Sequence, residues 1–258
     1  MTSRQNSLAQ HFKSLHRPHH PLILANVYDG ASAKAVAALP TAQAIATASF
    51  AVAAAAGISD EELSREELLR SAKAIAATVR PTGKPLTVDI RDGYNADLEA
   101  IVTELVAAGV VGVNLEDFDN ATKTMYSAAE AVQRIETVLR AARAAGVPDF
   151  VVNARCDALL YQGSLEEVIE RGRAYLTAGA TTVFVWGGRS RGGISREEVV
   201  RLVEAFEGRL NVKALPGGLS TEELAEIGVA RISVGPGLLL AAMERVTELA
   251  RALLEGRF

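Results

Sequence analysis

Cysteine and histidine are nearly absent from this chain. Cys156 is the single cysteine among 258 residues, and the four histidines all lie within residues 11–20. One thiol excludes an intramolecular disulfide and a multi-cysteine metal site, while a catalytic triad or a histidine-bound zinc would need the N-terminal segment. We therefore expect a reducing, cytoplasmic setting and, for any metal, a hard cation with oxygen ligands.

Strong net charge and long apolar runs are missing too. The formal net charge is -4 and the arginines are scattered, which predicts no nucleic-acid partner. No segment approaches the ~18 uninterrupted apolar residues of a membrane span, and residues 1–14 carry no signal-peptide core. We expect a protein that is neither exported nor membrane-spanning. Hydrophobic residues make up 49% of the chain, which is enough for a large core.

Apolar strands alternate with amphipathic helices along the whole chain. Four serines at helix starts are each followed by a glutamate within three or four residues, as N-caps are, and Ala-Gly pairs end three helices. A helical lead-in occupies about residues 1–20. The expected strands are 22–26, 42–47, 86–90, 110–115, 149–153, 181–185, 210–214 and 230–234, and the helices that follow them are 30–39, 64–80, 96–108, 127–145, 165–178, 195–206, 220–227 and 237–255.

Eight strand–helix units of this kind predict a parallel sheet covered by helices. A run of eight at this length favours a closed (β/α)8 TIM barrel, an α/β fold, over an open doubly wound sheet. No linker or low-complexity tract interrupts the series, so we expect a single domain over residues 1–258.

Polar residues are rare inside the predicted strands and dense just after them. In a TIM barrel the carboxyl ends of the strands carry the reacting groups, so this contrast predicts a functional site there. The residues at these positions are Asn26, Tyr28, Asp29, Thr47, Ser49, Phe50, Asp89, Arg91, Asn114, Glu116, Asp117, Asn153, Arg155, Asp157, Trp186, Lys213, Ser233 and Gly235.

Three acids are expected to meet at this rim: Asp89, Glu116 and, on the long second loop, Asp60. Carboxylates that lie close together need a cation or a proton between them. Mg²⁺ suits such a cluster, because it takes few protein oxygens directly and keeps waters and substrate oxygens as its other ligands. Alternatively, Arg91 and Arg155 pair with these acids in a structural ion network. The residues leave both interpretations open.

Six motifs, taken in order, resemble those of one superfamily. They are Asn26–Ala33, the loop Gly57–Asp60, Asp89-x-x-x-Gly93-Tyr94, Leu115-Glu116-Asp117, Asn153-Ala154-Arg155-x-Asp157-Ala158 and Gly228–Pro236. Each motif is weak alone, but their order and spacing argue against chance. Over essentially the whole chain, the sequence resembles the isocitrate lyase/phosphoenolpyruvate mutase superfamily, as a phosphoenolpyruvate mutase-like member.

The resemblance implies a (β/α)8 barrel that forms a homodimer or homotetramer, with the C-terminal helix exchanged between subunits. It also implies Mg²⁺ held near Asp89 and Glu116, largely through water, with Asp60 close by. The implied substrates are small 2-oxo or 2-hydroxy carboxylates or enolpyruvyl compounds. On this basis we expect metal binding at Asp89 and Glu116, catalytic roles for Arg155, Asp60 and Tyr28, and substrate binding by Ser49, Phe50, Asp89, Arg91, Asn114, Arg155 and Trp186.

Four departures from the superfamily pattern matter for the reaction. Arg91 stands two residues after Asp89, where the superfamily has a second metal-site acid. The Lys-Arg-Cys-Gly-His gate motif of the lyases is absent from the loop 117–126, in which Lys123 could play a gating part. Ala46 replaces a tyrosine of the lyases and Trp186 replaces a glutamate. Cleavage of isocitrate or methylisocitrate is therefore not expected.

The leading hypothesis is a Mg²⁺-assisted enzyme that makes or breaks a C–C or C–P bond beside the carbonyl of a small 2-oxo carboxylate, through an enolate. If Arg91 points inward, a dicarboxylate such as oxaloacetate or 2-oxoglutarate is favoured, because a second carboxylate needs a second cation. Two alternatives stay open. One is a catalytically silent binder of 2-oxo acids, and the other is Schiff-base aldolase chemistry at Lys213.

Overall fold

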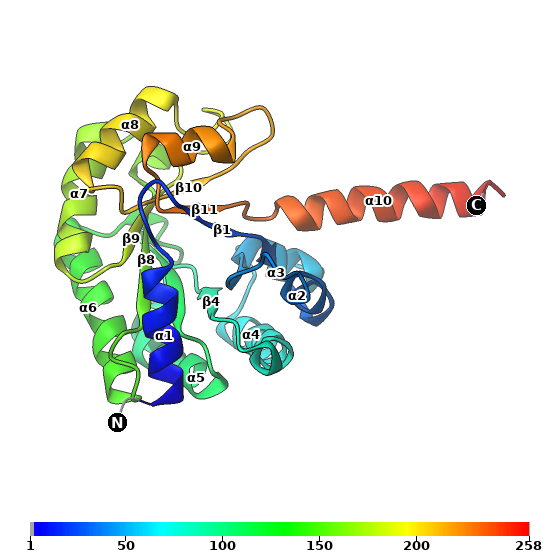
Figure 1. Ribbon diagram of the computed structural model, residues 1–258, viewed down its shortest axis with the longest axis horizontal. Helices are drawn as coiled ribbons and strands as arrows, with labels where there is room; N and C mark the ends of the chain where they lie inside the picture. The colour runs from blue at the N-terminus through cyan, green and yellow to red at the C-terminus, as the bar shows by residue number, and fades with distance from the viewer. Residues whose placement is uncertain (1–2, 258) are drawn as a thin grey trace.

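The computed structural model describes residues 3–257 and shows a barrel of parallel strands surrounded by helices (Figure 1). Met1, Thr2 and Phe258, which the single-domain prediction includes, lie outside the described residues. The α-helices are α1 (Arg4–Ser14), α2 (Gly30–Ala37), α3 (Ser49–Ala55), α4 (Arg65–Val79), α5 (Leu98–Ala108), α6 (Ala128–Ala144), α7 (Leu165–Thr177), α8 (Arg196–Ala205), α9 (Thr221–Ile227) and α10 (Gly237–Leu254).

Nine parallel strands form the main sheet in the order β1-β11-β10-β9-β8-β5-β4-β3-β2. The two strands at its edges are consecutive in the chain, so the peptide through Ala25 joins the edges and nearly closes the barrel. The strands are β1 (Leu22–Leu24), β2 (Asn26–Val27), β3 (Ile45–Thr47), β4 (Leu86–Asp89), β5 (Gly112–Glu116), β8 (Val151–Cys156), β9 (Thr182–Val185), β10 (Leu210–Lys213) and β11 (Arg231–Ser233).

The predicted (β/α)8 architecture is confirmed, and the local signals explain why it forms. Ser127, Ser164, Ser195 and Ser220 are the N-caps of α6 to α9, and each side chain accepts a hydrogen bond from the backbone N–H three residues on. This bond satisfies one of the helix's unpaired N–H groups. Gly109 ends α5 with a φ of 100°, in the left-handed region that favours glycine.

The structure differs from the sequence prediction in three places. The first predicted strand is split at Ala25 into β1 and β2, because its two halves pair with strands on opposite sides. The loop after β3 contains α3, a short alanine-rich helix of seven residues. A two-stranded antiparallel hairpin, β6 (Phe118–Asp119) with β7 (Thr124–Met125), occupies the loop where the lyase gate motif is absent.

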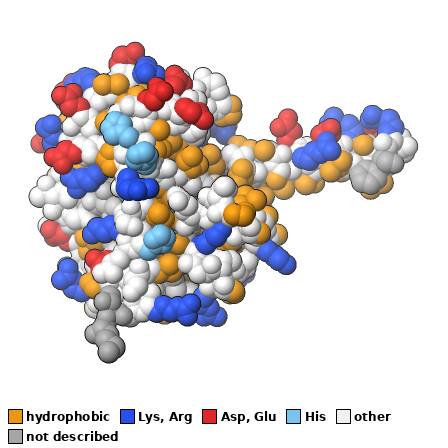
Figure 2. Space-filling model, viewed as in Figure 1, with side chains coloured by type: hydrophobic (Ala, Val, Ile, Leu, Met, Phe, Trp, Pro, Cys, Tyr) orange, Lys and Arg blue, Asp and Glu red, His pale blue; other side chains and the backbone are white. Residues whose placement is uncertain are grey.

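Helix α10 extends away from the barrel instead of packing on it (Figure 1). One side of this helix is hydrophobic in Figure 2. Its exposed apolar side chains are Leu238, Leu240, Met243, Val246, Leu249, Leu253 and Leu254. Exposed apolar faces of this length are typical of surfaces that another molecule covers; exchange of α10 between subunits stays a prediction. None of the described helices is both long and apolar enough to cross a membrane.

Candidate active site

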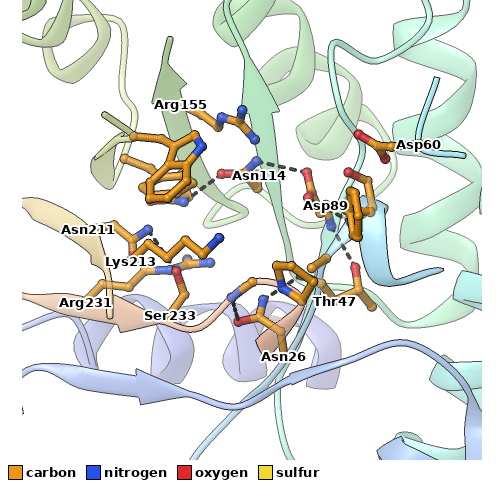
Figure 3. A pocket seen from close by; sticks show the side chains of 18 of the residues that line it. Asn26, Thr47, Asp60, Asp89, Asn114, Arg155, Asn211, Lys213, Arg231 and Ser233 are labelled. Atoms are coloured by element: carbon orange, nitrogen blue, oxygen red, sulfur yellow. Dashed lines mark hydrogen bonds between the residues drawn. The ribbon is translucent and has the colours of Figure 1, made fainter. Parts of the chain in front are cut away.

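A cavity of about 420 Å³ opens at the carboxyl ends of the strands, where the sequence predicted the site (Figure 3). Its wall on the β3–β5 side carries acids and amides, and its wall on the β10–β11 side carries cations. The cavity is lined by Asn26, Thr47, Ala48, Ser49, Phe50, Asp60, Asp89, Asn114, Asn153, Arg155, Leu160, Phe184, Trp186, Gly188, Arg189, Asn211, Lys213, Arg231, Ser233, Gly235 and Pro236.

Asp89 is fixed in orientation by a chain of hydrogen bonds across four neighbouring strands. Thr182 Oγ1 donates to Asn153 Oδ1 at 2.6 Å, and Asn153 Nδ2 donates to Asn114 Oδ1 at 2.8 Å. Asn114 Nδ2 then donates to Asp89 Oδ1 at 2.9 Å, while the backbone N–H of Ser49 donates to Asp89 Oδ2 at 2.9 Å. The register that places these residues side by side also holds the carboxylate facing the cavity (Figure 3).

Asp60 reaches the same cavity from the loop after α3. Its Oδ1 atom is buried and has no hydrogen-bond partner within the described chain. Burial raises the pKa of this carboxyl, and the nearby charge of Asp89 raises it further, although Arg91 opposes the shift. An unpartnered carboxylate oxygen beside a second carboxylate is a position that a cation would stabilise.

Glu116 belongs to an ion network that borders the cavity. Arg155 Nη1 donates to Glu116 Oε1 at 2.7 Å, and Arg155 Nε donates to Asp157 Oδ1 at 2.7 Å. Burial raises the pKa values of Glu116 and Asp157, and the charge of Arg155 opposes both shifts. Glu116 lines a smaller adjoining hollow of about 330 Å³, whose lining shares Asp60 and Arg155 with the main cavity.

Three of the expected site residues do not line the main cavity, and Glu116, which borders the adjoining hollow, is one of them. Arg91 has a φ of 54°, and its buried guanidinium donates to the carbonyl of Leu63 at 3.4 Å in the adjoining hollow. Tyr28 packs against Ala48 beside the start of α10. Asp89, Asp60, Arg155, Asn114, Ser49, Phe50 and Trp186 are brought together as expected.

The acids fit a hydrated divalent cation better than a cation held by protein alone. Within residues 3–257, no three Asp, Glu, His or Cys side chains converge closely enough to hold an ion by themselves. Both carboxylate oxygens of Asp89 accept hydrogen bonds, one from Asn114 and one from Ser49. Oδ1 of Asp60 has no hydrogen-bond partner within the described chain and is available to a cation or its water. Mg²⁺ commonly binds through one or two carboxylates and keeps waters and substrate oxygens as its other ligands.

The opposite wall holds residues that the strand-end reasoning missed. Asn211 pairs with Arg231 across the adjacent strands β10 and β11, two residues before the pair formed by Lys213 and Ser233. All four side chains line the cavity. The alternation of polar and apolar residues in β10 and β11 could have revealed them, because successive side chains in a strand point to opposite faces. Lys213 lies 4.2 Å from the ring centroid of Trp186.

The fold and the placement of the site define a class: a TIM-barrel enzyme whose chemistry occurs at the carboxyl ends of the strands. The family model described as phosphoenolpyruvate phosphomutase matches residues 12–254. The chain therefore belongs to this family, within the isocitrate lyase/phosphoenolpyruvate mutase superfamily, whose members act on C–C or C–P bonds.

Three relatives illustrate the range of this family. An uncharacterized protein from Mycobacterium tuberculosis is 31% identical over 95% of this chain and 89% of its own length. A phosphonopyruvate hydrolase from a Variovorax species is 28% identical over 66% of this chain and 59% of that protein. The structure of oxaloacetate acetylhydrolase in complex with the product oxalate has 27% identity and a TM-score of 0.83, covering 97% of this chain and 88% of that one.

Proposed function

We propose that this protein is a Mg²⁺-assisted enzyme that makes or breaks a C–C or C–P bond next to the carbonyl of a small 2-oxo carboxylate, through an enolate. The observation that carries the proposal is that Asp60, Asp89 and Arg155 face one cavity from three different parts of the chain. Phosphonopyruvate and oxaloacetate, which name two of its relatives, are acids of this kind.

Breaking a bond to the carbon beside a ketone leaves an electron pair that the carbonyl oxygen takes up as an enolate. The residues in this cavity suit that change of charge. Asp89 and Asp60 would hold Mg²⁺ through water, with Glu116 in the adjoining hollow, and the ion would supply positive charge to the developing oxyanion. Arg155, oriented by Glu116 and Asp157, would hold the substrate oxygen and neutralise the same charge.

The substrate carboxylate would lie near the start of α3. The N–H of Phe50 is in the first turn of this helix, where backbone N–H groups lack an acceptor within the helix. The N–H of Ser49 already donates to Asp89, so it couples the carboxylate end of the pocket to the proposed cation site. Phe50 and Trp186 would limit the access of water to the enolate.

A purified-protein assay tests this proposal. With Mg²⁺ present, we expect product formation from phosphonopyruvate or oxaloacetate, loss of turnover on chelation, and loss in the variant Asp89→Asn. Glu99→Gln, on the exposed side of α5, is the matched control and should retain wild-type turnover. Binding of 2-oxo acids without turnover of any of them would instead support the silent binder.

Schiff-base chemistry at Lys213 is a second candidate, because burial lowers the pKa of Lys213 to about 8, with the charges of Arg155 and Arg189 contributing. A larger unprotonated fraction makes an amine more nucleophilic. Borohydride reduction in the presence of substrate should then modify Lys213, as a mass shift on its peptide. An unmodified peptide after turnover discards this candidate.

A further inference from the structure

Two cations on the β10–β11 wall lack an acidic partner. Lys213 and Arg231 both line the cavity, and neither forms an ion pair with any acid of residues 3–257. The other two cations that line the cavity differ, because Arg155 pairs with Glu116 and Asp157 at 2.7 Å each and Arg189 is exposed on the loop after β9. The two cations on the β10–β11 wall therefore have no ion-pair partner among residues 3–257, although the charge of Asp89 across the cavity acts on Arg231.

Arg231 is the more unusual of the two. Only 3% of the residue is exposed, and its buried Nε has no hydrogen-bond partner within the described chain. Its contact at the barrel base is with His16 Nε2, 3.4 Å from Nη1. Burial and the charge of Arg231 lower the pKa of His16 to about 3, so this imidazole is neutral at physiological pH. A buried guanidinium without an ion-pair partner is costly, and an anionic ligand bound beside it would offset part of that cost.

Lys213 stands above Arg231 on the neighbouring strand. The strand register pairs Asn211 with Arg231, which places Lys213 two residues, or roughly 7 Å, nearer the mouth of the cavity. The ring of Trp186 on one side and Gly235 on the other confine the ammonium group; a Cβ on Gly235 would lie 3.0 Å from Lys213 Cε. Lys213 is thus a positioned cation and not a solvated surface lysine.

The cavity is consequently divided by charge. Asp60 and Asp89 occupy the wall opposite Lys213 and Arg231, as Figure 3 shows. Arg91, the residue expected from the sequence to provide a second cation, donates instead to the carbonyl of Leu63 in the adjoining hollow and does not line this cavity. The cations that face the two acids across this cavity are therefore Lys213 on β10 and Arg231 on β11.

We propose that Lys213, with Arg231 beneath it, binds a second anionic group of the substrate, a carboxylate or phosphonate at the end remote from the 2-oxo acid group. Lys213 is then the residue that selects dianionic over monoanionic 2-oxo acids. This inference rests on the proposed function for the 2-oxo end of the molecule, and on the unpaired cations for the other end.

The test compares ligands that differ in the remote group. Trp186 is the sole tryptophan and contacts Lys213, so its fluorescence reports on this end of the cavity; calorimetry provides the affinities. The ligand pairs are 2-oxoglutarate with 2-oxopentanoate, and phosphonopyruvate with 2-oxobutyrate. In each pair a methyl group replaces the remote anionic group, which is a carboxylate in the first pair and a phosphonate in the second. Succinate lacks the oxo group. The variants are Lys213→Met, Lys213→Arg and, as a charge-matched control, the exposed Lys34→Met.

For wild type and Lys34→Met we expect at least one dianion to bind at least about tenfold more tightly than its partner, the range of one hydrogen bond to a charged group. Lys213→Met should abolish that preference while leaving monoanion affinity unchanged. Lys213→Arg should keep the preference, which a Schiff-base role for the amine would not explain.

The inference is overturned if the wild type binds the dianion and the monoanion of each ligand pair with equal affinity. It is also overturned if Lys213→Met weakens the binding of both ligands of a pair equally. The proposed function stands in either case. If succinate binds as tightly as 2-oxoglutarate and Lys213→Met weakens both, the second-anion subsite stands and the proposed function fails. Absence of binding for every compound overturns both.

Discussion

Replacing Arg155 by methionine would remove the shared partner of two buried carboxylates. Glu116 and Asp157 are 7% and 3% exposed at the side chain, and each lies 2.7 Å from the guanidinium. Removing one partner of a buried ion pair costs about 3–5 kcal/mol. For a protein of this size, each kcal/mol lowers Tm by about 2–4 °C. We therefore expect Arg155→Met to unfold about 6–20 °C below wild type near pH 8.

The loss of stability in Arg155→Met should be smaller at acidic pH, whereas a packing defect would not depend on pH in this way. Burial already holds the pKa of Glu116 above its usual value, and losing Arg155 would raise it further. Between the unfolded and folded pKa values the folded state then binds more protons, so stability falls as pH rises and recovers as pH falls towards the unfolded pKa. Thermal unfolding by circular dichroism at pH 8 and pH 5.5 measures this.

The control is Arg140→Met on the exposed face of α6, which should change stability by less than about 0.5 kcal/mol at either pH. An Arg155→Met protein that melts with wild type at pH 8, or that is destabilised more at pH 5.5 than at pH 8, would refute the assignment of Glu116 and Asp157 to this ion network.

Three further outcomes follow from other parts of the structure. Glutamate at Val246 and Leu249 on the exposed face of α10 should convert an oligomer to monomers in analytical ultracentrifugation; unchanged assembly would show that this face is not the interface. Affinity for a second anionic group should fall as pH rises through about 8, where Lys213 loses its proton, and calorimetry showing a flat profile to pH 9.5 would contradict its ammonium role. Gly172→Ala should lower Tm although alanine favours helices by about 1 kcal/mol, because its Cβ would lie 2.3 Å from the buried ring of Phe206, an overpacking that costs about 1–3 kcal/mol; a raised Tm would show that the ring moves freely.

The sequence predicted the barrel because each of its units carries its own local signals. Serine caps such as Ser127, glycine ends such as Gly109 and strands apolar on both faces are properties of short segments, and parallel strands with helical crossovers admit few arrangements. The acids and amides at the strand ends were predictable for the same reason: strand position alone brings Asp89, Asn114 and Asn153 to one rim.

Side-chain direction could not be predicted in this way. Arg91 lies two residues past the end of β4 with a positive φ, and that backbone conformation sends its guanidinium to Leu63 instead of the cavity. Whether Glu116 meets a metal or Arg155 depends on distances of a few ångströms between separate strands, which no local pattern records. Arg231 was overlooked because a charged residue inside a strand contradicts the expectation of an apolar interior.

The most direct test of the account is calorimetric titration of a 2-oxo acid, such as phosphonopyruvate or 2-oxoglutarate, with Mg²⁺ or with a chelator, in wild type and in Asp89→Asn. If Asp89, Asp60 and Arg155 share one cation and one organic anion, Mg²⁺ and the oxo acid must tighten each other's binding reciprocally, and Asp89→Asn must weaken that coupling by at least about tenfold. Oxo-acid affinity that is the same with chelator as with Mg²⁺, and the same in Asp89→Asn, would contradict the account.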